Sequence, residues 1–93
     1  MIKLVQISSA ARKQLRKVPA HVVDKLLAWV LLVENRGLDE GRRVPGYHDE
    51  PLKGKRKGQR SIRLTRAYRA IYRILRDGSI EFVIVEEVSK HGY

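Results

Sequence analysis

The chain has 93 residues, a formal net charge of +10 and no cysteine. This length suits one domain with one core, and an apolar fraction of 43% argues against disorder despite the charge. Without cysteine the chain can form neither disulfides nor thiolate metal sites or nucleophiles. A pI of about 10.4 indicates an acidic partner: nucleic acid, an acidic protein or an anionic membrane surface.

Export and membrane insertion are not predicted by any stretch of the chain. Lys3 and Gln6 interrupt the early apolar run, which therefore does not predict a signal peptide. The longest apolar run, residues 26–33, is too short to span a bilayer. We therefore expect a cytoplasmic protein that does not use a membrane surface.

The first third of the chain predicts a strand followed by two helices. Residues 2–7 are short and rich in β-branched side chains, which favours a strand. Ser8 or Ser9 provides an N-cap hydroxyl for a helix that runs to about Lys17. Pro19 ends that helix or begins the next one.

The second helix is predicted over residues 20–35, with Gly37 as its C-cap. Trp29 is expected at the margin of its apolar face. The residues expected on that face are Val23, Leu26, Leu27, Val30, Leu31 and Val33. We interpret the two helices as an amphipathic hairpin that covers a sheet.

The remainder of the chain predicts a loop and three strands. Glycine and proline punctuate residues 38–58, which favours a long loop. Strands are predicted over 60–66, 68–76 and 80–88, with Asp77-Gly78 as a hairpin turn. The last strand is apolar on both faces and is expected to be central. The order β-α-α-β-β-β predicts an α+β fold, a helical hairpin on a small antiparallel sheet.

Half of the twenty basic residues lie in residues 51–76, a stretch that contains no Asp or Glu. From Arg60 onward the arginines are interleaved with branched and aromatic residues, as in a half-buried strand and unlike a basic tail. Like charges on adjacent strands repel each other. These ten cations have no acid nearby, so a polyanionic partner would relieve their mutual repulsion. The plainer alternative is a solvated sheet face that contributes little to stability.

Strand periodicity assigns these arginines to faces only in part. Arg63 points away from the predicted core residues Ile62 and Leu64. Arg69 and Arg73 share one face of the next strand, but the pattern does not decide whether that face is buried.

The run L-K-G-x-x-K-G-x-R-S-I-R-L, the run Y-R-A-I-Y-R-I, the D-G hairpin and the strand end V-S-K-H together resemble the bacterial RelE/ParE toxin superfamily. RelE and YafQ-like mRNA interferases of type II toxin–antitoxin systems look nearest. The resemblance covers essentially the whole chain, 1–93, as one RelE-like domain. It implies mRNA cleavage, commonly in the ribosomal A site, without a metal or other cofactor. The ribose 2′-OH attacks the adjacent phosphate in that family. Such a transesterification needs guanidinium groups, a base, an acid and aromatic surface. His91 or Glu50 could serve as base or acid, and the aromatic candidates are Tyr47, Tyr68 and Tyr93.

Carried over residue by residue, the resemblance implies five catalytic residues: Arg69, Arg63, Glu50, His91 and Tyr93. Arg69 matches the arginine that relatives use on the scissile phosphate. Relatives place Lys or His where this chain has Arg63, and YafQ-like relatives place His where it has Glu50. The identities of base and acid therefore stay open. The residues expected to bind RNA are Lys53, Lys55, Arg56, Lys57, Arg60, Arg73, Lys90 and His48.

Together with the basic stretch, this resemblance implies a ribosome-dependent endoribonuclease toxin, and we expect its cognate antitoxin to be acidic and to wrap or block the cationic face. One alternative is a ParE-type toxin that poisons DNA gyrase by protein contact. Another is an RNA-binding module without catalysis, in which phosphate contacts supply affinity. His91 and the density of arginines favour the nuclease.

Overall fold

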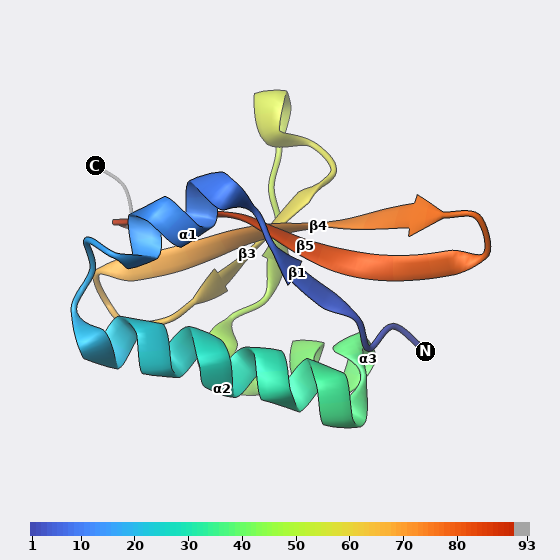
Figure 1. Ribbon diagram of the computed structural model, residues 1–93, viewed down its shortest axis with the longest axis horizontal. Coiled ribbons are helices and arrows are strands. Elements are labelled where there is room, and N and C mark those ends of the chain that lie inside the picture. Colours follow the sequence, from blue (N-terminus) through green and yellow to red (C-terminus); the bar gives the residue numbers. More distant parts are fainter. Residues whose placement is uncertain (91–93) are drawn as a thin grey trace.

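A mixed five-stranded sheet forms the centre of the fold (Figure 1). The computed structural model describes residues 1–90. The strand order is β1-β5-β4-β3-β2, from β1 (Val5–Ile7), β2 (Glu50–Pro51), β3 (Gln59–Arg63), β4 (Tyr68–Asp77) and β5 (Ile80–Lys90). The α+β class with an N-terminal strand and two leading helices is confirmed. The sheet is mixed rather than purely antiparallel, because β1 runs parallel to β5.

Helix α1 (Ser9–Leu15) is shorter than predicted but begins where its cap signal indicated. The Ser8 hydroxyl accepts a hydrogen bond from the Ala11 amide at 3.0 Å, which satisfies one of the free N–H groups of the first turn. The Ser8 amide also donates to the carbonyl of Val85 at 2.9 Å. The cap therefore fixes α1 directly to β5.

Helix α2 (Ala20–Arg36) follows Pro19, which is its N-cap residue. Its buried residues are Val22, Leu26, Trp29 and Val33. The prediction that Trp29 lies at the margin is wrong, since this side chain is fully buried and its ring centroid lies 5.2 Å from that of Tyr72. Leu27 and Leu31, expected on the buried face, are exposed. The apolar run of α2 is continuous, so spacing alone did not select the face that reaches Tyr72.

The segment expected to be one long loop instead contains several short elements. Gly37 ends α2 as predicted, with φ +89° and its amide bound to the carbonyl of Val33 at 2.7 Å. After it come α3 (Leu38–Arg42), the 3₁₀ turn η1 (Pro45–Tyr47), strand β2 and the 3₁₀ turn η2 (Gly54–Arg56). These elements are too short for periodicity to reveal, and their glycines and prolines suggested a loop.

The three predicted strands are confirmed, although β3 ends earlier and β5 extends further than expected. Gly78 and Ser79 form the β4–β5 turn, with Gly78 at φ +62° and Asp77 opposite Ile80. Strand β5 is internal, between β1 and β4, as predicted. The core lies between the sheet and the helices, and its fully buried members include Trp29, Ile62 and Tyr72.

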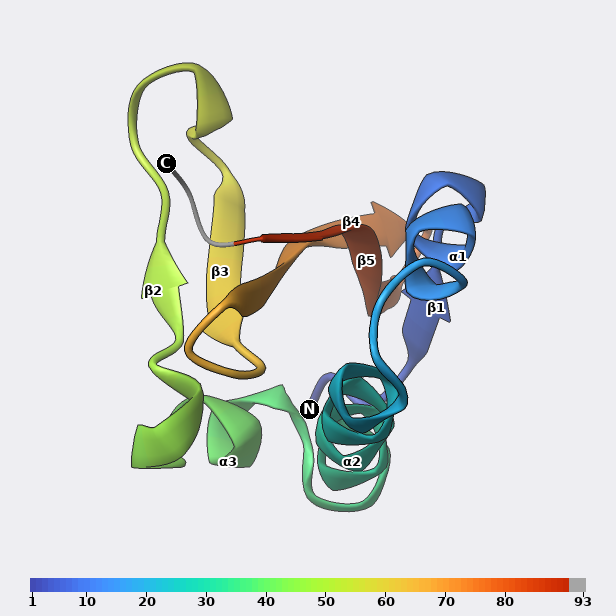
Figure 2. The same cartoon turned by 90° about the vertical axis from the view of Figure 1, so that its left-hand side faces the viewer.

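The helices and the basic hairpin lie on different sides of the strands. In Figure 2, α1 and α2 lie to the right of and below β4 and β5, whereas the hairpin formed by β2, η2 and β3 rises on the left. Within residues 1–90, no helix combines the length and apolarity needed to cross a membrane.

Candidate nucleic-acid interface

The sheet face opposite the core, which we call the open face, carries arginines from β3 and β4. Ile62 and Tyr72 are buried in the core, so the alternate residues of their strands point to the open face. This result decides the orientation of β4 that the sequence left open. The cross-strand pairs on the open face are Arg63–Arg69, Ser61–Ile71 and Gln59–Arg73.

Arg63 and Arg69 lie directly opposite each other, where two like charges repel. The Arg63 side chain is exposed. The Nε atom of Arg69 is buried and has no hydrogen-bond partner within residues 1–90. A buried donor without an acceptor is unfavourable, and an anion bound to this guanidinium would remove that cost. The structure thus brings together the two arginines that the sequence placed at the scissile phosphate.

A β-bulge adds two carboxylates to this arginine-bearing face. Ile71 lies opposite Glu87, while the next residue of β4 lies opposite Val85, so Glu86 is the extra residue in β5. Such an extra residue breaks the alternation of faces along a strand. Val85 and Val88 are therefore both buried, and Glu86 and Glu87 between them both reach the arginines.

The two carboxylates hold the neighbouring basic side chains in place. Arg73 Nε and Gln59 Nε2 each donate to Glu86 Oε1 at 3.0 Å. Arg56 Nη2 donates to Glu87 Oε1, also at 3.0 Å. The expectation of ten cations with no acid nearby is therefore wrong, because β5 supplies acids from outside the basic stretch. Arg56 and Arg73 are half-buried and already paired.

Hydrogen bonding keeps both carboxylates ionised to lower pH than usual. The hydrogen bond from Gln59 lowers the pKa of Glu86 below its ordinary value, and Arg73 adds to this against the effect of burial. Burial acts to raise the pKa of Glu87, but hydrogen bonds from Ser89 and Arg56 outweigh it and lower that pKa. Both groups are therefore carboxylates at neutral pH.

The loop between β2 and β3 presents a second group of cations. Figure 2 shows η2 at the tip of this hairpin, away from α2. Lys53, Lys55 and Lys57 are exposed around this turn, whereas Arg56 is tied to Glu87. Gly54 and Gly58 both have positive φ, +65° and +96°, which lets the loop turn without strain. The three lysines therefore form an exposed, positively charged tip on this hairpin.

Asp49 anchors the turn that carries the candidate residues His48 and Glu50. Its side chain is fully buried, and it accepts hydrogen bonds from Arg60 Nε at 2.6 Å and from the Tyr72 hydroxyl at 2.5 Å. Burial and this hydrogen bond raise the pKa of Tyr72 well above its usual value. Burial acts to lower the pKa of Arg60, but the bond to Asp49 raises it. Sequence reasoning missed this triad, which joins residues distant in the chain.

The triad places Arg60 apart from the other predicted RNA-binding residues. Arg60 lies opposite Tyr72 in the β3–β4 ladder, so it points to the core side and not to the open face. Glu50 lies opposite Ser61 and shares the open face, where it is exposed. His48 is exposed and has left-handed backbone angles, φ 46° and ψ 50°, an uncommon conformation outside glycine.

The end of β5 lies beside the arginine pair. Lys90 is exposed and opposite Tyr68, and Ser89 lies opposite Arg69. His91 and Tyr93, two of the five predicted catalytic residues, lie outside the described residues. Among residues 1–90, no three His, Asp or Glu side chains are grouped so as to hold a metal ion.

Sequence reasoning missed Asp49, Glu86 and Glu87 as members of this region. One signal for the bulge was present in the sequence: the change from a two-residue to a three-residue spacing at Val83, Val85 and Val88. No local signal marked Asp49, because its partners Arg60 and Tyr72 lie 11 and 23 residues away.

No protein-family model matches the chain, and no curated protein matches it significantly. Solved structures of toxins are similar to it. The RelE–RelB complex from Pyrococcus horikoshii OT3 is 20% identical, with a TM-score of 0.71 over 99% of this chain and 98% of that chain. The DinJ–YafQ complex from E. coli is 25% identical, with a TM-score of 0.66 over 97% and 94%.

A third similar structure is the YoeB/ParE toxin from Agrobacterium tumefaciens, which is 22% identical, with a TM-score of 0.68 over 96% of this chain and 99% of that chain. Together these similarities confirm, at the level of the fold, the resemblance found in the sequence. The chain has the RelE-like fold of the RelE/ParE toxin superfamily.

Proposed function

We propose that this protein is the toxin of a type II toxin–antitoxin pair and that it cleaves mRNA at its open face. The observation that carries this proposal is the Arg63–Arg69 pair, in which a buried Nε of Arg69 lacks a partner within residues 1–90. Solved toxins of the same fold supply the biological context. The proposal treats the arginine pair as the site of the scissile phosphate.

The proposed reaction is a transesterification within the RNA strand. The ribose 2′-oxygen loses its proton and bonds to the adjacent phosphorus, and the bond to the 5′-oxygen of the next nucleotide breaks. That oxygen takes up a proton, so the products are a 2′,3′-cyclic phosphate and a 5′-hydroxyl. Arg63 and Arg69 stabilise the negative charge that develops on the phosphate. This chemistry needs no metal or cofactor.

His91 and Glu50 are the proposed proton-transfer groups. A carboxylate or an imidazole can accept the 2′-hydroxyl proton and another acid can protonate the leaving oxygen. Glu50 lies on the open face within reach of solvent. His91 and Tyr93 enter through the family resemblance, with Tyr93 as the aromatic surface on which an unstacked base rests.

The residues that we propose bind the RNA backbone surround the Arg63–Arg69 pair. Lys53, Lys55 and Lys57 contact the backbone through the exposed loop, and Lys90 contacts it from the end of β5. The remaining proposed RNA contacts come from His48, near Glu50 in the chain, and from Arg56 and Arg73. Glu87 and Glu86 hold these two arginines in position. Arg60 is not among the proposed RNA-binding residues, because its Nε forms an ion pair with buried Asp49.

The proposed partners are a cognate antitoxin and the ribosome, in the cytoplasm. Similar structures include complexes named RelE–RelB and DinJ–YafQ. The formal charge of +10 favours an antitoxin with an acidic segment over the open face. Cleavage in the ribosomal A site follows from the resemblance to mRNA interferases.

Brief expression in a bacterial host tests the proposal. The wild type is expected to arrest growth and to create new mRNA 5′ ends within translated regions. Arg69→Ala should remove these ends. Arg76→Ala is the matched control, because Arg76 lies on the same strand in an exposed pair with Glu81 at 3.6 Å. Growth arrest with unchanged mRNA ends would refute cleavage, and gyrase-dependent DNA damage would then support the ParE-type alternative.

Retained toxicity after Arg63→Ala, Arg69→Ala and His91→Ala, each tested alone, would also refute the nuclease mechanism. It would favour one of the two alternatives, a ParE-type toxin or an RNA-binding protein that does not cleave RNA. Co-expression of the neighbouring reading frame, if that frame encodes the antitoxin, should restore growth.

A further inference from the structure

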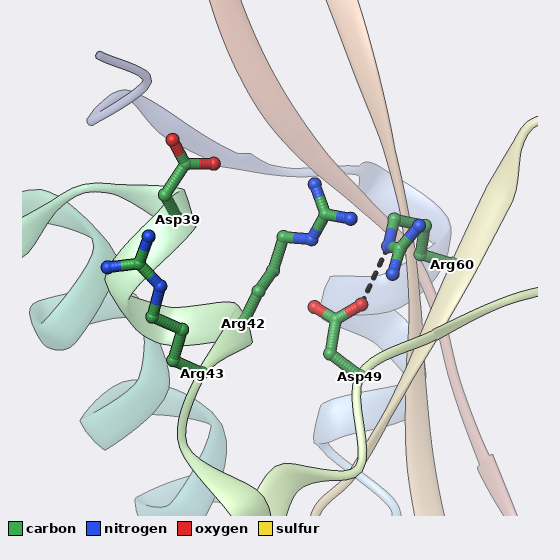
Figure 3. A pocket seen from close by; sticks show the side chains of 5 residues that line it. All are labelled: Asp39, Arg42, Arg43, Asp49 and Arg60. Carbon is green, nitrogen blue, oxygen red and sulfur yellow. Dashed lines mark hydrogen bonds and ion pairs between the residues drawn. The ribbon is translucent and has the colours of Figure 1, made fainter.

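An open pocket of about 510 Å³ lies between α3 and β3. Figure 3 shows the five side chains that line it: Asp39, Arg42, Arg43, Asp49 and Arg60. Arg60 points to the core side of the sheet, as its position opposite Tyr72 requires. The pocket is therefore separate from the open face, and it contains none of the proposed catalytic residues.

Guanidinium groups outnumber free carboxylates in this pocket. Asp49 is fully buried, and both of its oxygens are engaged, one by Arg60 Nε and the other by the Tyr72 hydroxyl. Asp49 remains negatively charged and offsets the charge of Arg60. The other acid of the pocket is Asp39, and the other two guanidinium groups are those of Arg42 and Arg43.

The three arginines differ in how they are held. Arg60 is fixed by Asp49, with only 20% of its side chain exposed. Arg42 makes no ion pair or side-chain hydrogen bond with any of residues 1–90, and in Figure 3 its guanidinium lies between the Asp39 carboxylate and the Arg60 guanidinium. Arg43 makes only a 3.6 Å pair with Glu40, both well exposed, and such pairs contribute little.

We propose that this pocket binds a phosphate group. A fixed guanidinium, that of Arg60, and a free one, that of Arg42, line the same open pocket, and guanidinium groups bind phosphate oxygens through two N–H groups. Holding Arg60 in advance lowers the entropy lost on binding. The phosphate belongs either to a free nucleotide or inorganic phosphate, or to the backbone of an RNA strand. Asp39 opposes the anion and limits its affinity.

Titration of the full chain with inorganic phosphate and with adenosine 5′-monophosphate tests the proposal. Binding is followed through the arginine Nε–Hε signals in ¹H–¹⁵N NMR spectra, which also show that each variant is folded. Arg42→Gln should weaken binding at least about tenfold, as expected for the loss of a charge-assisted hydrogen-bonding group. Asp39→Asn should strengthen it. The matched control is Arg36→Gln, which removes one exposed arginine at the end of α2.

An affinity that falls with Arg42→Gln, rises with Asp39→Asn and is unchanged in Arg36→Gln supports the site. Equal losses in Arg42→Gln and Arg36→Gln, or no saturable change in the pocket signals, would overturn it. A short single-stranded RNA that competes with phosphate identifies a strand contact, whereas failure to compete identifies a free phosphate compound. These readouts do not depend on RNA cleavage.

Discussion

Replacing Asp49 with alanine is expected to destabilise the fold more than any exposed acidic substitution. The change leaves the Arg60 guanidinium, 20% exposed, and the Tyr72 hydroxyl without their shared acceptor. Removing one partner of a buried ion pair costs about 3–5 kcal/mol. Because Arg60 keeps some access to water, we expect the lower end, about 3 kcal/mol.

This loss is large for a chain of this size. Stabilities of about 0.05–0.15 kcal/mol per residue predict a total of about 5–14 kcal/mol for 93 residues. A loss of 3 kcal/mol should lower Tm by about 12–24 °C. Tyr72→Phe, which removes one hydrogen bond to a charged group and leaves the ion pair, should cost about 1.5 kcal/mol.

Urea unfolding followed by tryptophan fluorescence measures these losses. Trp29 is the sole tryptophan, and its ring contacts that of Tyr72, so it reports on the anchor itself. Asp39→Ala is the control, a second acid of the same pocket that is exposed and costs less than about 1 kcal/mol. If Asp49→Ala costs no more than Asp39→Ala, the anchoring argument is wrong.

The remaining predictions concern charge and catalysis. Replacing the three lysines of residues 53–57 with alanine should reduce the slope of log K against log salt for single-stranded RNA by about 2, which filter binding at several salt concentrations measures. The lowered pKa values of Glu86 and Glu87 stabilise the fold above the ordinary pKa of about 4.3, and this contribution is lost as pH falls through their folded values. A Glu86→Gln/Glu87→Gln double variant should therefore lose less free energy of unfolding than the wild type between about pH 6 and about pH 3. Urea unfolding at those two pH values measures this loss, and a steeper loss in the variant than in the wild type would contradict the prediction. His91→Gln should keep RNA affinity and lose about 10²–10⁴-fold in cleavage rate, whereas a parallel loss of affinity would assign it to binding.

Local signals predicted most of the elements. Ser8 caps α1 and Gly37 ends α2, because these residues satisfy helix ends through short-range geometry. The three C-terminal strands were likewise marked by alternating side chains and a glycine turn. These features depend on neighbours in the chain, so the sequence contains them directly.

Features that depend on distant partners were not predictable in this way. Trp29 is buried because Tyr72 lies against it, a contact across 43 residues of chain that periodicity does not encode. The bulge at Glu86 is set by the pairing of β4 with β5, and it supplies the acids that the basic stretch lacks. The resemblance to known toxins selected Arg63 and Arg69, and strand pairing in the structure places them opposite each other.

Cleavage by the purified protein on programmed ribosomes tests the central claim most directly. Ribosomes with a defined codon in the A site are incubated with wild type, Arg69→Ala or Arg76→Ala in the presence of a chelator that leaves ribosomal magnesium in place, and the RNA ends are analysed. The arginine-pair account predicts a 2′,3′-cyclic phosphate and a 5′-hydroxyl from the wild type and Arg76→Ala, with little product from Arg69→Ala. Equal cleavage by Arg69→Ala, or no cleavage by the wild type, would contradict it.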